Sequence, residues 1–254
     1  MPEINLEFYN YNDYRMPLME KLLSAAAAML VVCAAAYVFY RSAPLCAIVS
    51  PIGLLYLPYR RKQQIIKRKD ALKHQFRDML YSLSSGLMAG KTLESALRDV
   101  RGDLEIIYPD PETAIVREVD IMLRKMLLNE TIDAALGDLA ERSGIEDIDS
   151  FCNVLATCRK MGGNLVEIVK NTTNILGDKM EIKNEIDVLL AQRRFEKKIL
   201  NIMPIALVFV LSVTAKDYIE PVFTTLTGKI VMSAAILLIA VSWLLSEKIM
   251  NIDV

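Results

Sequence analysis

The chain has 254 residues, of which 53% are hydrophobic and 24% are charged, and its formal net charge is −1. This composition is too apolar for an ordinary soluble domain and too charged for a protein that lies wholly within a membrane. Four Cys and one His, without a CxxC pair, are a poor set of metal ligands, and we interpret the cysteines as free thiols in a reducing compartment. The charges are segregated along the chain, so the net charge conceals the pattern that matters.

Residues 1–21 are polar and aromatic, and acidic residues come first. A secretory signal peptide instead begins with basic residues, followed by a short apolar core and a cleavage site of small residues. We therefore reject a signal peptide and predict a cytosolic N-terminal lead-in, amphipathic or loosely ordered, over residues 1–21.

Two pairs of stretches contain no Asp, Glu, Lys or Arg. They cover residues 22–40, 43–59, 199–215 and 230–246. About 20 apolar residues cross a bilayer, with a lower limit of about 17. We predict four transmembrane helices in two hairpins, residues 22–59 and 199–246. Residues 216–229 form the outer loop, and residues 247–254 return to the cytosol as a tail. A charge inside a span would favour a transport path, and these stretches have none.

Basic residues adjoin the predicted spans at two places. Residues 60–69 carry six positive charges, and residues 193–198 carry four against one Glu. Positive charge marks the cytoplasmic side of a span and is attracted to anionic lipid, so we predict a membrane collar and no nucleic-acid site. The collar residues are Arg60, Arg61, Lys62, Lys67, Arg68, Lys69, Arg193, Arg194, Lys197 and Lys198.

The segment between the two basic runs is acidic. From Asp70 to Gln192 there are 14 Lys and Arg against 22 Asp and Glu, a net charge of −8. This acidic body makes up most of the predicted cytosolic domain, residues 60–198, and it is expected to stay away from an anionic membrane below the basic collar. Its surface suits a basic partner, although a solvated acidic face explains the composition equally well.

A weak internal repeat divides this acidic segment. Three times an amphipathic helix pattern ends at a turn and a second, capped helix follows, which predicts three hairpins and an all-α, six-helix bundle without strands. A Gly or Asn ends each first helix, and a Thr or Asn caps each second one. The turn residues are Gly90, Thr92, Asn129, Thr131, Gly162, Gly163 and Asn164. The last helix has no Pro before the second basic run, so one continuous helix is predicted to enter the membrane.

Other motifs are weak. The sequence Gly90-Lys91-Thr92 resembles the end of a phosphate-binding loop, but position 85 is Ser where that motif needs Gly, and no strand precedes it. His74 has no nucleophile pointing to it. The pairs Asp147 with Asp149 and Glu181 with Glu185 lack the loop spacing of a cation site. We predict no catalytic residue, no cofactor and no metal, and leave open whether a divalent cation binds the acidic bundle.

The arrangement resembles the type II secretion system F family, and within it the TadB/TadC-like platform proteins of tight-adherence (Tad) pili. The resemblance rests on the segment from Phe76 through Ala89-Gly90-Lys91-Thr92-Leu93 to Leu97, and on Met161-Gly162-Gly163-Asn164-Leu165. It covers about residues 70–215. General secretion members have two copies of the bundle and this chain has one, which points to the Tad branch. Met161 stands where Ser or Ala is more common in the family.

The resemblance implies a non-enzymatic, multi-pass platform in the cell (inner) membrane, with both termini in the cytosol. Such proteins bind a hexameric assembly ATPase, a sister platform protein or a second copy of themselves, pilins and membrane lipid. The alternative is a membrane-anchored adaptor or sensor that binds a soluble regulator, and a membrane enzyme is disfavoured because no nucleophile cluster is found. The sequence does not identify the pilin, the oligomer or the face that binds the ATPase.

Overall fold

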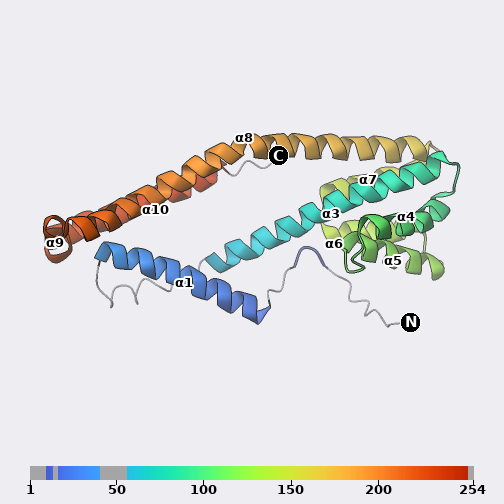
Figure 1. The fold of residues 1–254 in the computed structure, drawn as a ribbon. Coiled ribbons are helices and arrows are strands. Elements are labelled where there is room, and N and C mark those ends of the chain that lie inside the picture. Colours follow the sequence, from blue (N-terminus) through green and yellow to red (C-terminus); the bar gives the residue numbers. More distant parts are fainter. Residues whose placement is uncertain (1–9, 14–16, 41–55, 251–254) are drawn as a thin grey trace. The chain divides into compact units, whose positions relative to one another are not determined.

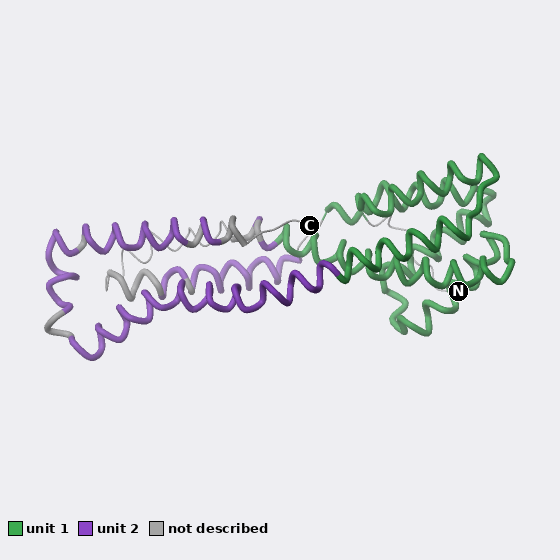
Figure 2. The backbone as a smooth tube through the Cα atoms, turned by 90° about the horizontal axis from the view of Figure 1, so that it is seen from above, with its two compact units in different colours: residues 1–15, 61–181 green, residues 16–60, 182–254 purple. Residues whose placement is uncertain are grey.

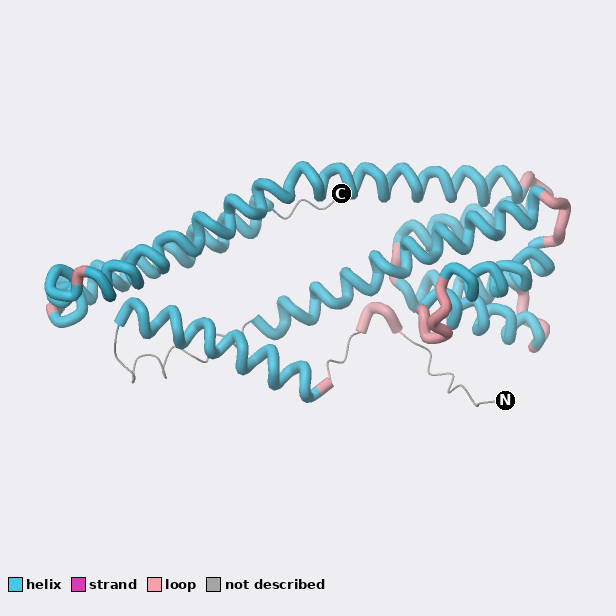
Figure 3. The backbone as a smooth tube through the Cα atoms, in the orientation of Figure 1, coloured by secondary structure: helices cyan, strands magenta, loops and turns pink. Residues whose placement is uncertain are grey.

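The computed structural model describes residues 10–13, 17–40 and 56–250, and within them it has helices and no strand (Figures 1 and 3). The all-α fold class is therefore confirmed for this part of the chain. Much of the predicted second span, residues 43–59, lies outside the described residues, as do residues 1–9 and 251–254. The helices are α1 (Leu18–Tyr40), α3 (Tyr56–Met88), α4 (Leu93–Ile107), α5 (Ala114–Leu127), α6 (Ile132–Ser143), α7 (Glu146–Met161), α8 (Leu165–Thr214), α9 (Lys216–Thr224) and α10 (Leu226–Met250).

The chain divides into two compact units (Figure 2). Unit 1 contains residues 1–15 and 61–181, and unit 2 contains residues 16–60 and 182–254. The bounds of unit 1 differ from the predicted cytosolic domain, residues 60–198. Unit 1 ends 17 residues earlier on α8, because the last core side chains of that helix, Leu176 and Met180, lie just before the division.

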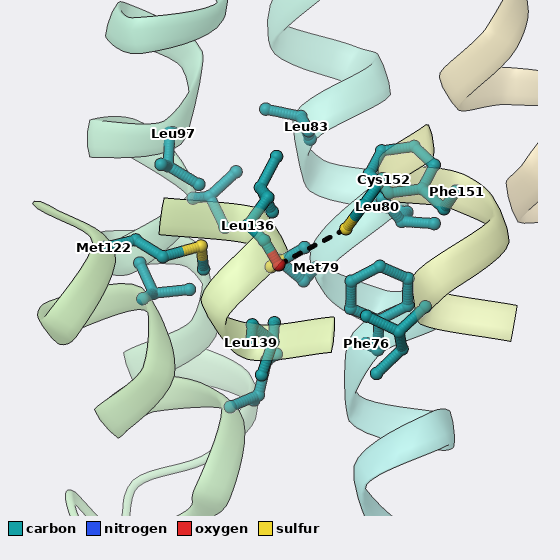
Figure 4. Packing of buried hydrophobic residues seen from close by; sticks show 14 of the residues in the cluster. Phe76, Met79, Leu80, Leu83, Leu97, Met122, Leu136, Leu139, Phe151 and Cys152 are labelled. Atoms are coloured by element: carbon teal, nitrogen blue, oxygen red, sulfur yellow. Dashed lines mark hydrogen bonds between the residues drawn. The ribbon is translucent and has the colours of Figure 1, made fainter. Parts of the chain in front are cut away.

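Unit 1 is built around a single hydrophobic cluster (Figure 4). The α3 side chains Leu72, Phe76, Leu80 and Leu83 recur at helical spacing and are at most 2% exposed, because this face of α3 is covered by later helices. Helices α3 to α8 all contribute buried residues to the cluster. Consecutive helices of unit 1 pack together, with α5 against α4 and α6, and α6 against α7.

The centre of the cluster joins α3 to α7. The rings of Phe76 and Phe151 meet edge to face, with centroids 5.6 Å apart and an interplanar angle of 76°. The Cys152 thiol donates to the carbonyl oxygen of Leu136 at 3.4 Å, which holds α7 against α6 (Figure 4). Burial raises the pKa of Cys152 to about 12, so this thiol stays protonated and acts as a core side chain.

Unit 2 has the opposite distribution of apolar residues. Large hydrophobic side chains on α1, α10 and the end of α8 are mostly exposed, among them Leu22, Leu207 and Leu238. Within this unit α10 contacts α9 and α1. The predicted polar loop over residues 216–229 is wrong in its local structure, because α9 occupies Lys216–Thr224 and α10 already begins at Leu226.

The N-terminal residues also differ from the simple lead-in that the sequence predicted. The described residues 10–13 belong to unit 1, and Tyr11 is 3% exposed within its core. Helix α1 begins at Leu18, four residues before the uncharged stretch. Tyr11, which precedes the first apolar helix, is therefore part of the core of unit 1.

Candidate functional site

Helix α8 is the candidate functional element, because it belongs to both units. It runs for 50 residues without interruption, which at about 1.5 Å per residue gives a length of about 75 Å. Near its start Val169, Leu176 and Met180 are buried in unit 1. Beyond the basic run its residues are uncharged up to Thr214, and Pro204 lies within the helix.

The second half of α8 has an exposed apolar surface. Among the described residues, α8 is the one helix long and apolar enough to cross a membrane. Only 6% of its most apolar stretch is buried, whereas a core helix of a soluble protein is mostly buried. The hydroxyl of Ser212 donates to the Val208 carbonyl oxygen at 2.9 Å, so its polar group is satisfied within the helix. On α10 a shorter apolar stretch covers Leu226–Ser242.

The turns within the three predicted helical hairpins share a backbone conformation. Gly90, Asn129 and Gly162 have positive φ angles of 81°, 64° and 72° respectively, which places each in the left-handed region that Gly and Asn tolerate best. These residues lie just beyond the ends of α3, α5 and α7, so each first helix of a pair ends in the same way.

The second helix of each pair is capped by the residue that the sequence singled out. The Thr92 hydroxyl accepts from the Ser95 amide at 3.3 Å, and the Thr131 hydroxyl accepts from the Ala134 amide at 3.2 Å. Asn164 Oδ1 accepts from the Glu167 amide at 3.4 Å at the start of α8. Each cap satisfies one of the amides that a helix start leaves without an intrahelical partner.

Gly163 has a different role from Gly162. Its φ is not positive, but a Cβ atom at this position would lie 2.6 Å from the Cys158 sulfur. The sequence named both glycines as turn residues, and the structure uses the second one for close packing against α7. Gly162 and Gly163 together therefore determine where α7 ends and α8 begins.

The predicted membrane collar is divided between the units. Arg60 and residues 193–198 belong to unit 2, and residues 61–69 belong to unit 1. Several of these cations have protein partners. Arg60 lies 3.7 Å from Glu20, Arg193 lies 3.1 Å from Glu196, Arg194 lies 2.9 Å from Asp187, and Arg61 pairs with Asp13. Lys62, Lys67 and Lys198 are exposed.

Two collar residues on α3 face other cations within unit 1. Burial and the nearby Arg117 lower the pKa of Arg68, and burial and the nearby Lys73 lower the pKa of Lys69. The Lys69 ammonium donates to Asn12 Oδ1 at 2.6 Å and to the Gly144 carbonyl oxygen at 3.0 Å. Lys69 therefore helps to hold the N-terminal residues, a role that the sequence analysis did not find.

Tyr11 is hydrogen-bonded to a buried ion pair. Arg142 on α6 donates to both carboxylate oxygens of Glu118 on α5, at 2.8 and 2.5 Å, and the Tyr11 hydroxyl donates to Glu118 Oε1 at 2.8 Å. The Tyr11 amide also donates to the Arg142 carbonyl oxygen at 3.1 Å. Burial and the Glu118 carboxylate raise the pKa of Tyr11, so the phenol stays neutral. Glu118 lies on the apolar face of α5 between Ile115 and Met122. A charged residue at such a position is the sequence signal that could have indicated the buried ion pair.

The described residues contain no group of three or more His, Cys, Asp or Glu side chains that could hold a metal ion. The Asp147 carboxylate forms salt bridges with Lys73 at 3.1 Å and with Lys179 at 2.5 Å. Lys91, which follows Gly90, pairs with Asp99 at 2.6 Å, and His74 is exposed. The residues that the sequence weighed for phosphate or metal binding thus have structural partners or lie at the surface.

Comparison with known proteins gives no relative. No family model, curated protein or solved structure matches this chain significantly. The geometry described above is therefore the basis for a functional proposal.

Proposed function

We propose that this chain is a non-enzymatic platform protein of the cell (inner) membrane that couples a cytosolic assembly ATPase to pilin insertion. The machine would be a Tad or type IV-like pilus or a type II secretion system. The observation that carries the proposal is α8, in which one uninterrupted helix has core residues of a packed helical unit at its start and an exposed apolar surface at its end. A helix of this kind transmits force without an intervening flexible linker.

In this proposal the chain crosses the membrane four times, as two hairpins with both termini in the cytosol. Helices α3 to α8 form a cytosolic six-helix bundle. The single core cluster of unit 1 and the exposed apolar side chains of α1, α8 and α10 support this division. Water excludes apolar side chains and lipid does not, so the two distributions suit two different solvents.

The partners would be a hexameric assembly ATPase, a second platform subunit or a second copy of this chain, pilins and anionic lipid. The net charge of −8 between Asp70 and Gln192 supports a basic surface on the partner and keeps this region away from the anionic bilayer. The basic residues adjoining the apolar stretches support lipid contact.

The experiment is crosslinking of the full-length protein in its native cells, followed by extraction in mild detergent and mass spectrometry of the captured proteins. Recovery of a hexameric secretion ATPase supports the platform. Recovery of a kinase or a soluble regulator, without an ATPase, replaces it with the adaptor or sensor function.

A second measurement tests the role of α8. Ile182→Pro removes a backbone hydrogen bond and introduces a clash in the middle of α8, which costs about 3 kcal/mol locally. Ile182 is 50% exposed, so Ile182→Ala is a matched control that keeps the helix. We expect the Pro variant to insert into the membrane but lose piliation, and the Ala variant to retain it. Normal piliation of the Pro variant contradicts coupling through α8.

A further inference from the structure

A shallow apolar groove lies on the surface of unit 1 between α7 and the first turns of α8. Its volume is about 370 Å³, and it is lined by Asn153, Val154, Thr157, Cys158, Met161 and Ile168. Val154 is 51% exposed and Met161 is 81% exposed, and Ile175, two helical turns beyond Ile168, is 55% exposed. Apolar side chains on adjoining helices thus stand open to solvent side by side.

Carboxylates accompany this groove on both helices. On α7 the Asn153 amide donates to Asp149 at 3.2 Å, which places Asp149 beside the groove. On α8 Glu167 directly precedes Ile168, and Asp178 lies one turn after Ile175. In the part of the chain that the structure describes, none of these three carboxylates has a salt bridge. Their charges are therefore directed to solvent or to a partner.

The carboxylates of α4 to α6 differ, because most of them are neutralised within unit 1. Their salt bridges are Glu94 and Asp133 with Arg159, Asp99 with Lys91, Glu105 and Asp120 with Arg101, Glu118 and Asp138 with Arg142, and Glu130 with Lys125. Carboxylates without a salt bridge are thus more frequent on α7 and the unit 1 part of α8, which also form the apolar groove, than on α4 to α6. The exposed Lys160 and Lys170 lie on the same two helices and have no salt bridge within the described residues.

From this we propose that the α7–α8 groove is the docking site for a basic amphipathic helix of the assembly ATPase. An apolar stripe on such a helix fills the groove, and Lys or Arg side chains beside that stripe pair with Asp149, Glu167 and Asp178. A second copy of this chain is disfavoured as the occupant, because a two-fold contact through this face places acidic residues against acidic residues. An anionic membrane is disfavoured for the same reason.

The position of the groove gives the docking a mechanical consequence. Ile168 forms one wall and is part of the first turn of α8, so a load applied in the groove acts directly on the start of that helix. This inference rests on the proposed function for the identity of the partner, whereas the chemistry of the groove can be tested without it.

The first experiment measures peptide binding to the full-length protein in neutral phosphatidylcholine nanodiscs. The probes are a synthetic amphipathic helix of Leu and Lys and its Leu and Glu counterpart, which have equal apolar faces. We expect the basic peptide to bind at least about tenfold more tightly than the acidic one, because charge complementarity discriminates between them. Equal binding of the two peptides, or no binding of either, overturns the docking site whether or not the chain is a platform.

Two pairs of variants locate the binding. Met161→Ser removes an exposed apolar side chain from the groove without adding charge, and Met88→Ser makes the same change at the equivalent last residue of α3, where Met88 is 60% exposed. Asp178→Lys reverses a charge beside the groove, and Glu141→Lys reverses an exposed one on α6. We expect Met161→Ser to weaken binding of the basic peptide by about tenfold and Asp178→Lys by about threefold, with little change in either control. Equal losses in tests and controls overturn the site.

The second experiment identifies the occupant in cells, with a photoreactive amino acid at position 161 or, as the control, at position 88. Crosslinking of the ATPase from position 161 and not from position 88 supports the inference. An ATPase crosslink from position 88 alone leaves the platform standing and overturns the groove, and a crosslink to a second copy of this chain overturns the proposed occupant. Peptide binding without any ATPase crosslink at either position removes the ATPase as occupant.

Discussion

Unit 1 and unit 2 use the same apolar residue types and expose them in opposite ways. Leu139 in unit 1 is 0% exposed, whereas Leu207 in unit 2 is 62% exposed. Phe151 and Phe209 differ similarly, at 2% and 55%. Exposed side chains of this size, repeated along several helices, need a surrounding other than water, because large exposed apolar patches mark membrane or protein contacts. Burial within the chain therefore stabilises unit 1, whereas the exposed apolar side chains of unit 2 are suited to contact with a membrane or another protein.

Helix α8 contains both distributions in one element. Up to Met180 it has a buried stripe and a solvent-facing side, and beyond the basic run it is apolar on all sides. A helix that is apolar all round is typical of a membrane span, and an amphipathic one is typical of a surface helix.

Phe151→Ala should have the largest effect. It removes one ring of the Phe76–Phe151 contact and leaves a cavity, at a cost of about 3–5 kcal/mol in the free energy of unfolding of unit 1. Phe209→Ala, the matched change in unit 2, should leave that free energy unchanged. Urea unfolding of the detergent-solubilised chain, followed by a probe in unit 1, measures both. Equal effects would show that the two units do not differ as described.

Arg142→Met tests the buried ion pair of unit 1. It leaves the Glu118 carboxylate buried without its cation and with a hydrogen bond from the Tyr11 hydroxyl, which we expect to cost about 3 kcal/mol. Adding Glu118→Gln should recover most of this loss, because the amide is neutral and still accepts from Tyr11. The same urea unfolding measures the single and double variants. A double variant no more stable than Arg142→Met would argue that the lost Arg packing, and not the buried charge, sets the cost.

Val210→Lys tests the apolar end of α8. A Lys near the centre of a transmembrane helix disfavours insertion by about 2.5 kcal/mol. Leu189→Lys, at a residue that is 75% exposed before the basic run, should have little effect. The readout is labelling of a cysteine at position 225 by a membrane-impermeant maleimide applied outside, in a chain whose native cysteines are replaced by Ala. Labelling should fall in Val210→Lys alone, and unchanged labelling there contradicts the span.

Asp147→Asn should have the smallest effect and should depend on pH. Burial alone raises the pKa of Asp147, but hydrogen bonds from Lys179 and Lys73 outweigh it, so the folded-state pKa lies below the ordinary value. A depressed carboxyl pKa stabilises the fold above the unfolded pKa of about 3.9, and this contribution is lost as the pH falls through the folded pKa. The Asn variant should therefore be about 1 kcal/mol less stable at neutral pH, and the difference should vanish in acid.

The matched control for that pH profile is Asp178→Asn, because Asp178 is exposed and has no salt bridge within the described residues. Its unfolding free energy should follow that of the wild type across the same pH range. A gap between Asp147→Asn and the wild type that persists unchanged into acid would show that packing, and not charge, causes the loss.

The helices of unit 1 and their turns could be predicted from the sequence, because local interactions specify them. Helical spacing of Leu and Phe predicted the buried faces. Gly or Asn residues followed by a Thr or Asn cap predicted where each hairpin turns. The uncharged stretches likewise stood out as predicted spans, because a charge inside a bilayer is unfavourable.

Contacts between residues far apart in the sequence depend on how the helices pack, and no local pattern predicted them. Tyr11 and Glu118 are 107 residues apart, and no local pattern links a phenol in a polar segment to a carboxylate on an apolar helix face. The packing of Gly163 against Cys158, the neutralisation of α4–α6 carboxylates and the unneutralised α7–α8 face also depend on how helices pack in three dimensions. Local periodicity specifies which side of a helix is buried, and the long-range contacts between helices select the partner that buries it.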